Sequence, residues 1–204
     1  MEEFDEALQA PGSDGTVNLS HRAYVTLDDQ LWSWGSKVLV MDLSYNHIQT
    51  LDEGIGNLTH LHTLDISSNA LQSLPEDIGN CVRLRVLRLN GNQLTRLPEQ
   101  ITQCKLLEEL YLSENRLTKL PDKVGTMLCL RKLTLANNNL KKLDCSIARC
   151  TVLDDIDVSN NPLTNVPQEL QGDSAMILWI MKFEFGSFSA CCAVCHDTSA
   201  RNCW

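Results

Sequence analysis

Leucines recur along this chain at spacings that fit neither one continuous helix nor one continuous strand. In the stretch LRLNGNQLTRLPEQI, residues 87–101, successive leucines lie two, five and three residues apart. A helix that buries one face repeats about every 3.6 residues, and a half-buried strand alternates every second residue. The mixed spacing therefore predicts a short strand that is followed by a turn and a return segment of another kind.

The same pattern recurs at a fixed 23-residue period. An asparagine closes the first half of each copy, at Asn46, Asn69, Asn92, Asn115, Asn138 and Asn161. The blocks that lead to these asparagines read VLVMDLSYN, LHTLDISSN, LRVLRLNGN, LEELYLSEN, LRKLTLANN and LDDIDVSNN. Self-similarity at such a period indicates a repeat architecture. Six repeats are predicted over residues 38–175.

Each repeat has a simple physical interpretation. The alternating pair Leu87 and Leu89 is expected to point into the core, because successive strand side chains face opposite ways. The asparagine is expected to bond backbone groups that the turn leaves unpaired, which would form a ladder through the stack. The return segment buries its own apolar residues. One unit cannot bury its apolar side alone, but stacked units share a continuous core.

The return segments are predicted to be short helices or 3-10 turns. Pro75, Pro98 and Pro121 are each followed by an acidic residue. Proline suits the first helical turn, and acidic side chains suit the positive end of the helix dipole. The first and fifth repeats carry Asp52 and Asp144 instead of the proline. We therefore expect those two repeats to turn differently.

The pattern L-x-x-L-x-L-x-x-N-x-L resembles the leucine-rich-repeat family. The 23-residue period with L-P-x-x-I is similar to its cytosolic Ras-group members, such as the Ras suppressor and the plant intracellular Ras-group relatives, over residues 38–182. The resemblance implies an α/β solenoid: a curved array with a parallel inner β-sheet, short helical or 3-10 return legs outside, and end caps. It also implies protein–protein scaffolding in signalling, sometimes on small GTPases or phosphatase complexes. The motif specifies the fold and not the partner.

The N-terminal end is expected to close the open core of the array. Residues 1–15 are acidic and polar and are expected to be flexible. Residues 16–37 are interpreted as a degenerate repeat that serves as the N-terminal cap. Its inward positions are Val17, Leu19, Leu27 and Leu31.

The C-terminal end is predicted to be a capping helix over residues 172–185. Its apolar run is shorter than the ~20 residues that span a bilayer, and it resembles the end of cytosolic leucine-rich-repeat arrays. Residues 186–204 form a cysteine-rich tail, for which a disordered segment is the simplest interpretation. Alternatives are acylation of Cys191 or Cys192, zinc binding, and c-type haem attachment at the Cys192–His196 pattern.

Composition narrows the class of protein. The net charge of −9 disfavours a nucleic-acid binder, which should carry a basic footprint. Three of the nine cysteines, Cys81, Cys104 and Cys150, share one repeat position with Leu58 and Met127, so we interpret them as reduced core residues. The start MEEFDEALQA lacks a basic and then apolar signal pattern, which favours a cytoplasmic protein.

No catalytic motif is found in the sequence. It contains neither of the glycine-rich phosphate-binding patterns and no serine in a G-x-S-x-G turn. We therefore expect a protein that is not an enzyme and that uses neither a cofactor nor a metal.

The strand residues that point away from the core are predicted to line a concave binding face. The central row across the repeats is Asp42, Asp65, Arg88, Tyr111, Thr134 and Asp157. Arginine and tyrosine are enriched at binding hot spots, so this row is the predicted contact surface, together with the outward-facing His62. The two neighbouring rows alternate in charge, as in Arg85, Glu108, Arg131 and Asp154, which indicates lateral ion pairs.

A second candidate surface is a basic ridge along the loops that follow the asparagines. It comprises Arg96, Arg116, Lys119, Lys141 and Lys142. Such a ridge could meet an acidic partner or an anionic lipid surface. The alternative function is accordingly a membrane-associated adaptor that uses this ridge and an acylated tail, whereas a solvated edge is the more ordinary interpretation.

Overall fold

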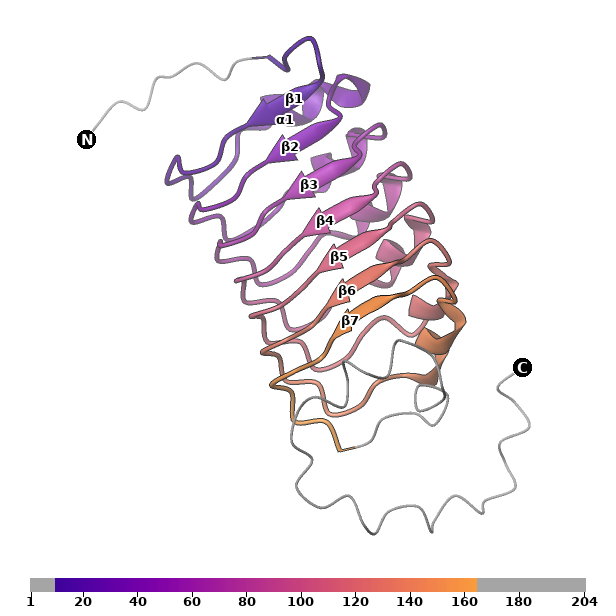
Figure 1. Cartoon of the computed structure of the whole chain (residues 1–204). Coiled ribbons are helices and arrows are strands. Elements are labelled where there is room, and N and C mark those ends of the chain that lie inside the picture. The colour runs from indigo at the N-terminus through magenta and orange to yellow at the C-terminus, as the bar shows by residue number, and fades with distance from the viewer. Residues whose placement is uncertain (1–9, 165–204) are drawn as a thin grey trace, which may run out of the picture.

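The computed structural model describes residues 10–164, which form a solenoid (Figure 1). Seven parallel strands follow one another in sequence order within a single sheet. The strands are β1 (Thr16–Asn18), β2 (Val40–Asp42), β3 (Thr63–Asp65), β4 (Val86–Arg88), β5 (Glu109–Tyr111), β6 (Lys132–Thr134) and β7 (Asp155–Asp157). The predicted repeat solenoid is thus confirmed.

The period of the sequence sets the register of the sheet. Leu87 in β4 pairs with Leu64 in β3 and with Leu110 in β5, so each partner holds the same position in an adjacent repeat. In every strand the middle residue is buried, and it points into the core behind the sheet. Equal repeat lengths therefore align equivalent residues into rows that run across the strands.

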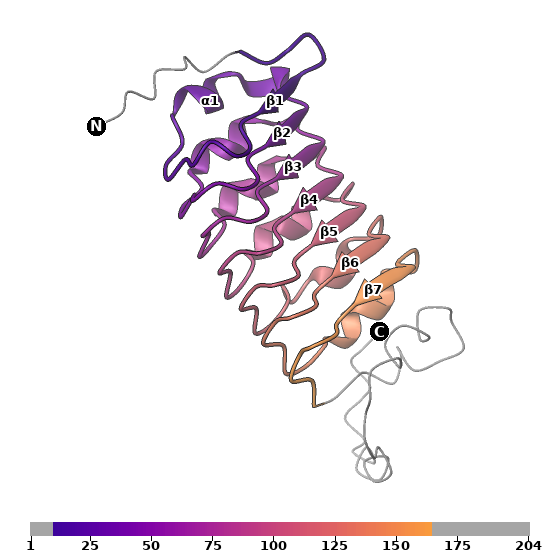
Figure 2. The ribbon, with the colours of Figure 1, turned by 60° about the vertical axis from the view of Figure 1, so that its left-hand side comes forward.

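The return segments form a second layer behind the sheet (Figure 2). They are 3-10 turns, as predicted: η2 (Glu53–Asn57), η3 (Glu76–Asn80), η4 (Glu99–Gln103), η5 (Val124–Thr126) and η6 (Cys145–Arg149). The N-terminal repeat instead carries the short helix α1 (Gln30–Ser33) and the turn η1 (Gly35–Lys37). The core lies between the sheet and these turns.

The expectation that the first and fifth repeats turn differently is wrong. The residue before the 3-10 turn is extended in both kinds of repeat, with ψ of 153° at Asp52 and 152° at Pro75. The carboxylate of Asp52 accepts a hydrogen bond from the backbone N–H of Gly54. Asp144 does the same for Ser146. In these two repeats a side-chain cap thus starts the turn that Pro75 and Pro98 start in theirs.

The asparagine ladder is present as predicted. The Nδ2 of Asn92 donates to the carbonyl oxygen of Leu89 at 3.1 Å and to that of Ile66 in the preceding repeat at 2.9 Å. Its Oδ1 accepts from the backbone N–H of Leu71 at 2.9 Å. The amide therefore satisfies buried backbone groups of two adjacent turns, which an apolar side chain could not do.

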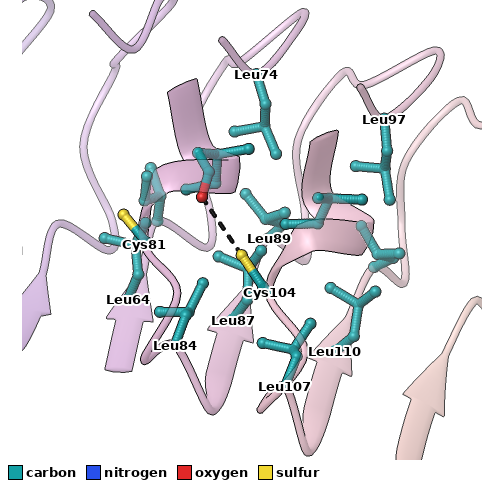
Figure 3. Close-up of a cluster of buried hydrophobic side chains, with 14 of the residues drawn as sticks. Leu64, Leu74, Cys81, Leu84, Leu87, Leu89, Leu97, Cys104, Leu107 and Leu110 are labelled. Atoms are coloured by element: carbon teal, nitrogen blue, oxygen red, sulfur yellow. Dashed lines mark hydrogen bonds between the residues drawn. The ribbon is translucent and has the colours of Figure 1, made fainter. Parts of the chain in front are cut away.

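The buried cysteines behave as apolar core residues (Figure 3). The thiol of Cys104 donates to the carbonyl oxygen of Ile78 in the preceding repeat at 3.4 Å, and Cys81 does the same for Ile55. Burial raises the pKa of both thiols to about 12. Within residues 10–164, Cys81, Cys104, Cys129 and Cys150 are free thiols. The interpretation of Cys81, Cys104 and Cys150 as reduced core residues agrees with these positions.

The N-terminal repeat joins the same sheet through β1. Residues 10–15, which were expected to be flexible, lead into β1 through a turn in which the N–H of Gly15 bonds to the carbonyl oxygen of Gly12. Trp32 is buried against the next repeat, where a methyl carbon on Gly54 would lie 2.4 Å from its ring. Close packing, rather than turn geometry, therefore requires Gly54. The predicted capping helix over 172–185 and the tail over 186–204 lie outside the described residues.

Candidate protein-binding surface

The predicted central row forms one continuous line across the sheet. Its members pair as direct neighbours: Asp42 with Asp65, Asp65 with Arg88, Arg88 with Tyr111, Tyr111 with Thr134, and Thr134 with Asp157. All six are partly exposed, on the face of the sheet that is turned away from the 3-10 turns. We call this the concave face. The structure thus brings these six residues together from β2 to β7.

Tyr111 is the centre of a cluster on this face. The guanidinium carbon of Arg88 lies 5.3 Å from the centroid of the tyrosine ring, and the Nζ of Lys132 lies 5.7 Å from it. The phenol O–H donates to the Oε2 of Glu109 at 2.8 Å. Both cations lie within the distance at which a ring quadrupole attracts positive charge. The ring is therefore held from three neighbouring strands, and we call these four residues the Tyr111 cluster.

The ionisation of the cluster follows from its contacts. Partial burial, and then the hydrogen bond to Glu109, raise the pKa of Tyr111. The hydrogen bond to Asp155 raises the pKa of Lys132, so the ammonium is retained. At neutral pH the cluster therefore presents a neutral phenol that donates to Glu109 and lies between two cations.

The rows beside the central row form part of the predicted ion-pair ladder. Arg85 pairs with Glu108, and the Nζ of Lys132 lies 2.5 Å from the Oδ2 of Asp155. Within residues 10–164, neither Arg88 nor Arg131 has a carboxylate at ion-pair distance. Arg88 in the central row and Arg131 directly before β6 are thus two cations without an acidic partner in the described part of the chain.

The aspartates of the central row have a structural task that the sequence interpretation missed. The Oδ1 atoms of Asp42, Asp65 and Asp157 accept hydrogen bonds of 2.9–3.0 Å from backbone N–H groups two residues further on. Each of these N–H groups belongs to a serine, and the recurring D-x-S spacing is the signal that could have revealed these turns. One oxygen of each carboxylate is therefore occupied, so the row is not uniformly available to a partner.

The other two predicted residues, His62 and Thr134, are less available to a partner or lie outside the central row. His62 precedes β3 and occupies the repeat position of Arg85, so it belongs to a neighbouring row. Thr134 lies beside Tyr111, and its Oγ1 is buried without a hydrogen-bond partner. Thr134 therefore offers a polar atom that is covered by the surrounding side chains rather than presented to solvent.

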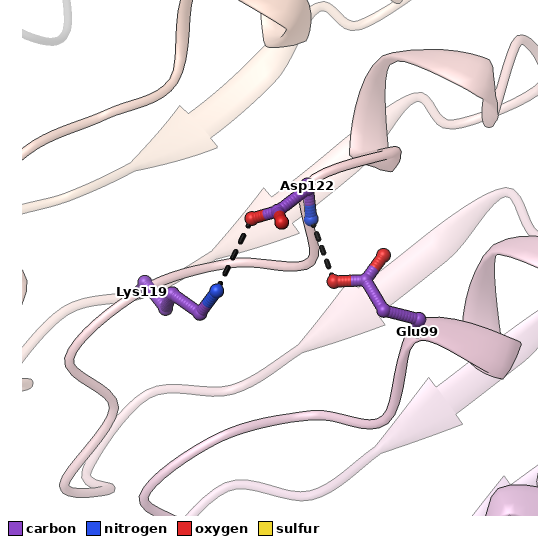
Figure 4. A network of polar contacts seen from close by, with 3 residues as sticks. All are labelled: Glu99, Lys119 and Asp122. Atoms are coloured by element: carbon purple, nitrogen blue, oxygen red, sulfur yellow. Dashed lines mark hydrogen bonds and ion pairs between the residues drawn. The ribbon is translucent and has the colours of Figure 1, made fainter.

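The basic ridge is exposed but partly neutralised. Lys119 forms an ion pair with Asp122, with Nζ and Oδ1 3.2 Å apart, and the backbone N–H of Asp122 donates to the Oε1 of Glu99 at 2.8 Å (Figure 4). Arg96, Arg116, Lys119, Lys141 and Lys142 are all exposed. The carboxylate of Asp122 therefore neutralises one of the five cations of the ridge, which weakens the field of the ridge on an anionic surface. No helix within residues 10–164 is long and apolar enough to span a bilayer.

Comparison with known proteins places this geometry in a family. The model described as "Leucine rich repeat" matches residues 37–94 and 105–163, and a model of two such repeats matches residues 82–123. The first model covers more than half of the chain. The chain belongs to the leucine-rich-repeat family. Leucine-rich-repeat domains generally serve protein binding and are usually not catalytic.

Two solved leucine-rich-repeat structures are similar to this chain. The leucine-rich-repeat protein LIC12759 of Leptospira interrogans is 32% identical with a TM-score of 0.74, over 83% of this chain and 43% of that protein. The ectodomain of the Arabidopsis thaliana receptor kinase SOBIR1 is 30% identical with a TM-score of 0.53, over 58% of this chain and 67% of that one. This chain thus spans less than half of the Leptospira protein. These neighbours show the family in general and not the Ras group in particular. A search of curated protein sequences found no match.

Proposed function

We propose that this leucine-rich-repeat chain is a non-enzymatic scaffold that binds a protein partner at the Tyr111 cluster of its concave face. The observation that carries the proposal is the placement of Arg88 and Lys132 against the ring of Tyr111, in the middle of the sheet. Tyrosine and arginine are enriched where interfaces contribute most binding energy. A ring that its neighbours already hold in place loses little freedom when a partner binds.

The chemistry of the cluster indicates what kind of group it receives. Arg88 has no carboxylate at ion-pair distance within the described residues, and Tyr111 presents an apolar ring beside it. A partner side chain with a carboxylate, or an aromatic ring that stacks on the guanidinium, would complement both groups. The aspartates at the two ends of the row would favour basic groups at the margins of the partner.

The cellular setting belongs to the same proposal. The repeat motif resembles Ras-group members of the family, which supports a role in intracellular signalling and partners such as a small GTPase or a phosphatase complex. A cytoplasmic location is part of this proposal, and it is supported by the buried thiols of Cys81, Cys104 and Cys150, which form no disulfide. The partly neutralised basic ridge offers less support for the alternative of a membrane adaptor.

Affinity capture from a native lysate tests the site. The full chain is compared with Arg88→Ala/Tyr111→Ala and with a control, Tyr45→Ala/Arg96→Ala, which removes the same residue types from exposed positions outside the concave sheet. We expect one protein to be retained by the wild type and the control and lost from the concave-face variant. Retention by all three proteins would refute the site.

Purified partner would then allow a quantitative test. Truncation of a hot-spot residue typically costs at least ~2 kcal/mol, so the concave-face variant should bind at least about thirty-fold more weakly. Circular dichroism and thermal unfolding of each variant would show that the fold is retained. Equal affinities of the wild type and the concave-face variant would contradict the proposal.

A further inference from the structure

Large apolar side chains are exposed along one edge of the solenoid. Among residues 10–164, six large hydrophobic residues are exposed, and four of them lie in the segments that run from the 3-10 turns into strands β4–β7. These four are Val82, Leu106, Leu128 and Val152, with 51%, 40%, 59% and 41% of their surface exposed. Scattered exposed apolar residues are ordinary, but a contiguous group indicates an interaction site.

The repeat register makes this group continuous. Val82 and Leu128 occupy one repeat position, and Leu106 and Val152 occupy the next position. One of the four therefore comes from each of four consecutive repeats. Neighbouring strands are ~4.8 Å apart, so the apolar stripe runs about 15 Å along the edge.

The fold does not require apolar residues in the stripe. The position of Val82 and Leu128 holds Thr59, Lys105 and Thr151 in the other repeats. The same backbone thus accommodates polar side chains at these positions. The solenoid fold therefore does not depend on an apolar side chain at this position.

The edge is also basic, although the whole chain is acidic. Arg83, Lys105 and Arg131 are exposed beside the stripe, and none of them has a carboxylate at ion-pair distance within the described residues. The Nζ of Lys105 donates to the Oγ1 of Thr126 in the next repeat at 2.9 Å, which positions the ammonium along the edge. The nearby Glu108 is already paired with Arg85.

We propose that this apolar and basic edge is a second docking surface, which binds an acidic amphipathic helix of a partner protein. A helix rises ~1.5 Å per residue, so about ten residues would cover a stripe of about 15 Å. Leucines at helical spacing would pack on the stripe, and flanking glutamates would meet Arg83, Lys105 and Arg131. An anionic membrane fits less well, because the chain carries a net charge of −9 and the stripe contains no aromatic side chain.

A synthetic amphipathic peptide, about 14 residues long so that its helix covers the whole stripe, tests the proposal directly. It carries leucines at positions 1, 4, 8 and 11 and glutamates on the flanks of this leucine face, and its binding to the full chain is measured by fluorescence anisotropy. We expect saturable binding that Leu106→Ser/Leu128→Ser weakens at least tenfold. The control variant Val25→Ser/Tyr45→Ser, which removes exposed apolar residues elsewhere, and Arg88→Ala/Tyr111→Ala should both bind as the wild type does.

Cys129 provides a local readout of occupancy. It is exposed and holds the repeat position of Leu106 and Val152, so it lies within the stripe. Bound peptide should slow its alkylation by a maleimide at least fivefold, as measured by mass spectrometry of the proteolytic fragment that contains it. In Leu106→Ser/Leu128→Ser, which binds the peptide more weakly, the same peptide concentration should slow this reaction much less.

Several results would overturn the proposal. One is the absence of peptide binding to the wild type. Another is binding of the peptide to Leu106→Ser/Leu128→Ser with the same affinity as to the wild type. A third is tighter binding of a matched peptide that carries lysines in place of the glutamates. Binding of the edge to phosphatidylserine vesicles but not to the peptide would assign it to a membrane. Self-association that the serine variant abolishes, without peptide binding, would assign it to a second copy of the chain.

Discussion

Substitution of one ladder asparagine, Asn115→Ala, is the sharpest test of how the solenoid is held together. Asn115 is buried at the centre of the array. Its Nδ2 donates to the carbonyl oxygens of Leu89 and Leu112, and its Oδ1 accepts from the N–H of Leu94 at 3.0 Å. Alanine keeps the Cβ but removes all of these bonds.

The size of the stability loss in Asn115→Ala depends on which backbone groups keep another hydrogen-bond partner. The carbonyl oxygens of Leu89 and Leu112 each retain a bond, from Asn92 at 3.1 Å and from Asn138 at 2.9 Å. The N–H of Leu94 retains none among the described contacts. One unsatisfied buried donor costs about 1–3 kcal/mol and each lost bond about 0.5–1.5 kcal/mol, so we expect a loss of about 2–6 kcal/mol. That is a large share of the ~5–15 kcal/mol that stabilises a typical domain.

Urea unfolding followed by far-ultraviolet circular dichroism measures this loss. The matched control is Asn139→Ala, which replaces an exposed asparagine in the adjacent loop and should change the free energy of unfolding by less than ~0.5 kcal/mol. The slope of free energy against urea concentration should stay the same for both variants, since the surface exposed on unfolding is similar. A loss below ~1 kcal/mol for Asn115→Ala, with an unchanged slope, would refute the ladder as a stabilising element.

Three further predictions test the core and the return segments. Because burial raises the pKa of Cys81 and Cys104 to about 12 from 9.0, the folded state keeps protons that the unfolded state releases. The free energy of unfolding should therefore fall as pH rises from 9 to 12, by up to ~1.4 kcal/mol per pH unit for each thiol, and this slope should flatten in Cys81→Ala/Cys104→Ala. Gly125→Ala should cost ~1–3 kcal/mol in urea unfolding, because the new methyl carbon would lie 2.1 Å from the carbonyl oxygen of Ser146; a neutral result would show that the repeats can move apart at little cost. Asp144→Ala should cost ~1 kcal/mol through loss of its cap, while Asp144→Pro should cost less, since φ at this position is −73°; equal losses would contradict the equivalence of the two turn starts.

The order and register of the sheet were accessible from the sequence. A 23-residue period, held through six copies, leaves one way to stack equal units so that their leucines share a core. The row from Asp42 to Asp157, the asparagine ladder and the cysteine positions follow from that register. Even the degenerate first repeat kept enough of the pattern, in Val17 and Leu19, for its inward residues to be found.

The contacts between side chains could be found only in the tertiary structure. The sequence aligned Arg88 with Tyr111 but could not show that Arg88 and Lys132 both approach the ring, because side-chain conformation depends on all the neighbours at once. The need for a glycine at position 54 likewise appears only in the structure, where Trp32 packs against it.

One physical difference separates what the sequence predicted from what only the tertiary structure showed. Each repeat buries its apolar residues in the same way, so their spacing alone determined that this chain is a solenoid with a defined inner row. The composition alone determined its net negative charge. The exposure of an individual side chain, in contrast, depends on how the repeats stack against one another. Val82, Leu106, Leu128 and Val152 read as ordinary apolar positions in the sequence, and only the folded array left them at one edge, beside cations that no carboxylate neutralises among the described residues.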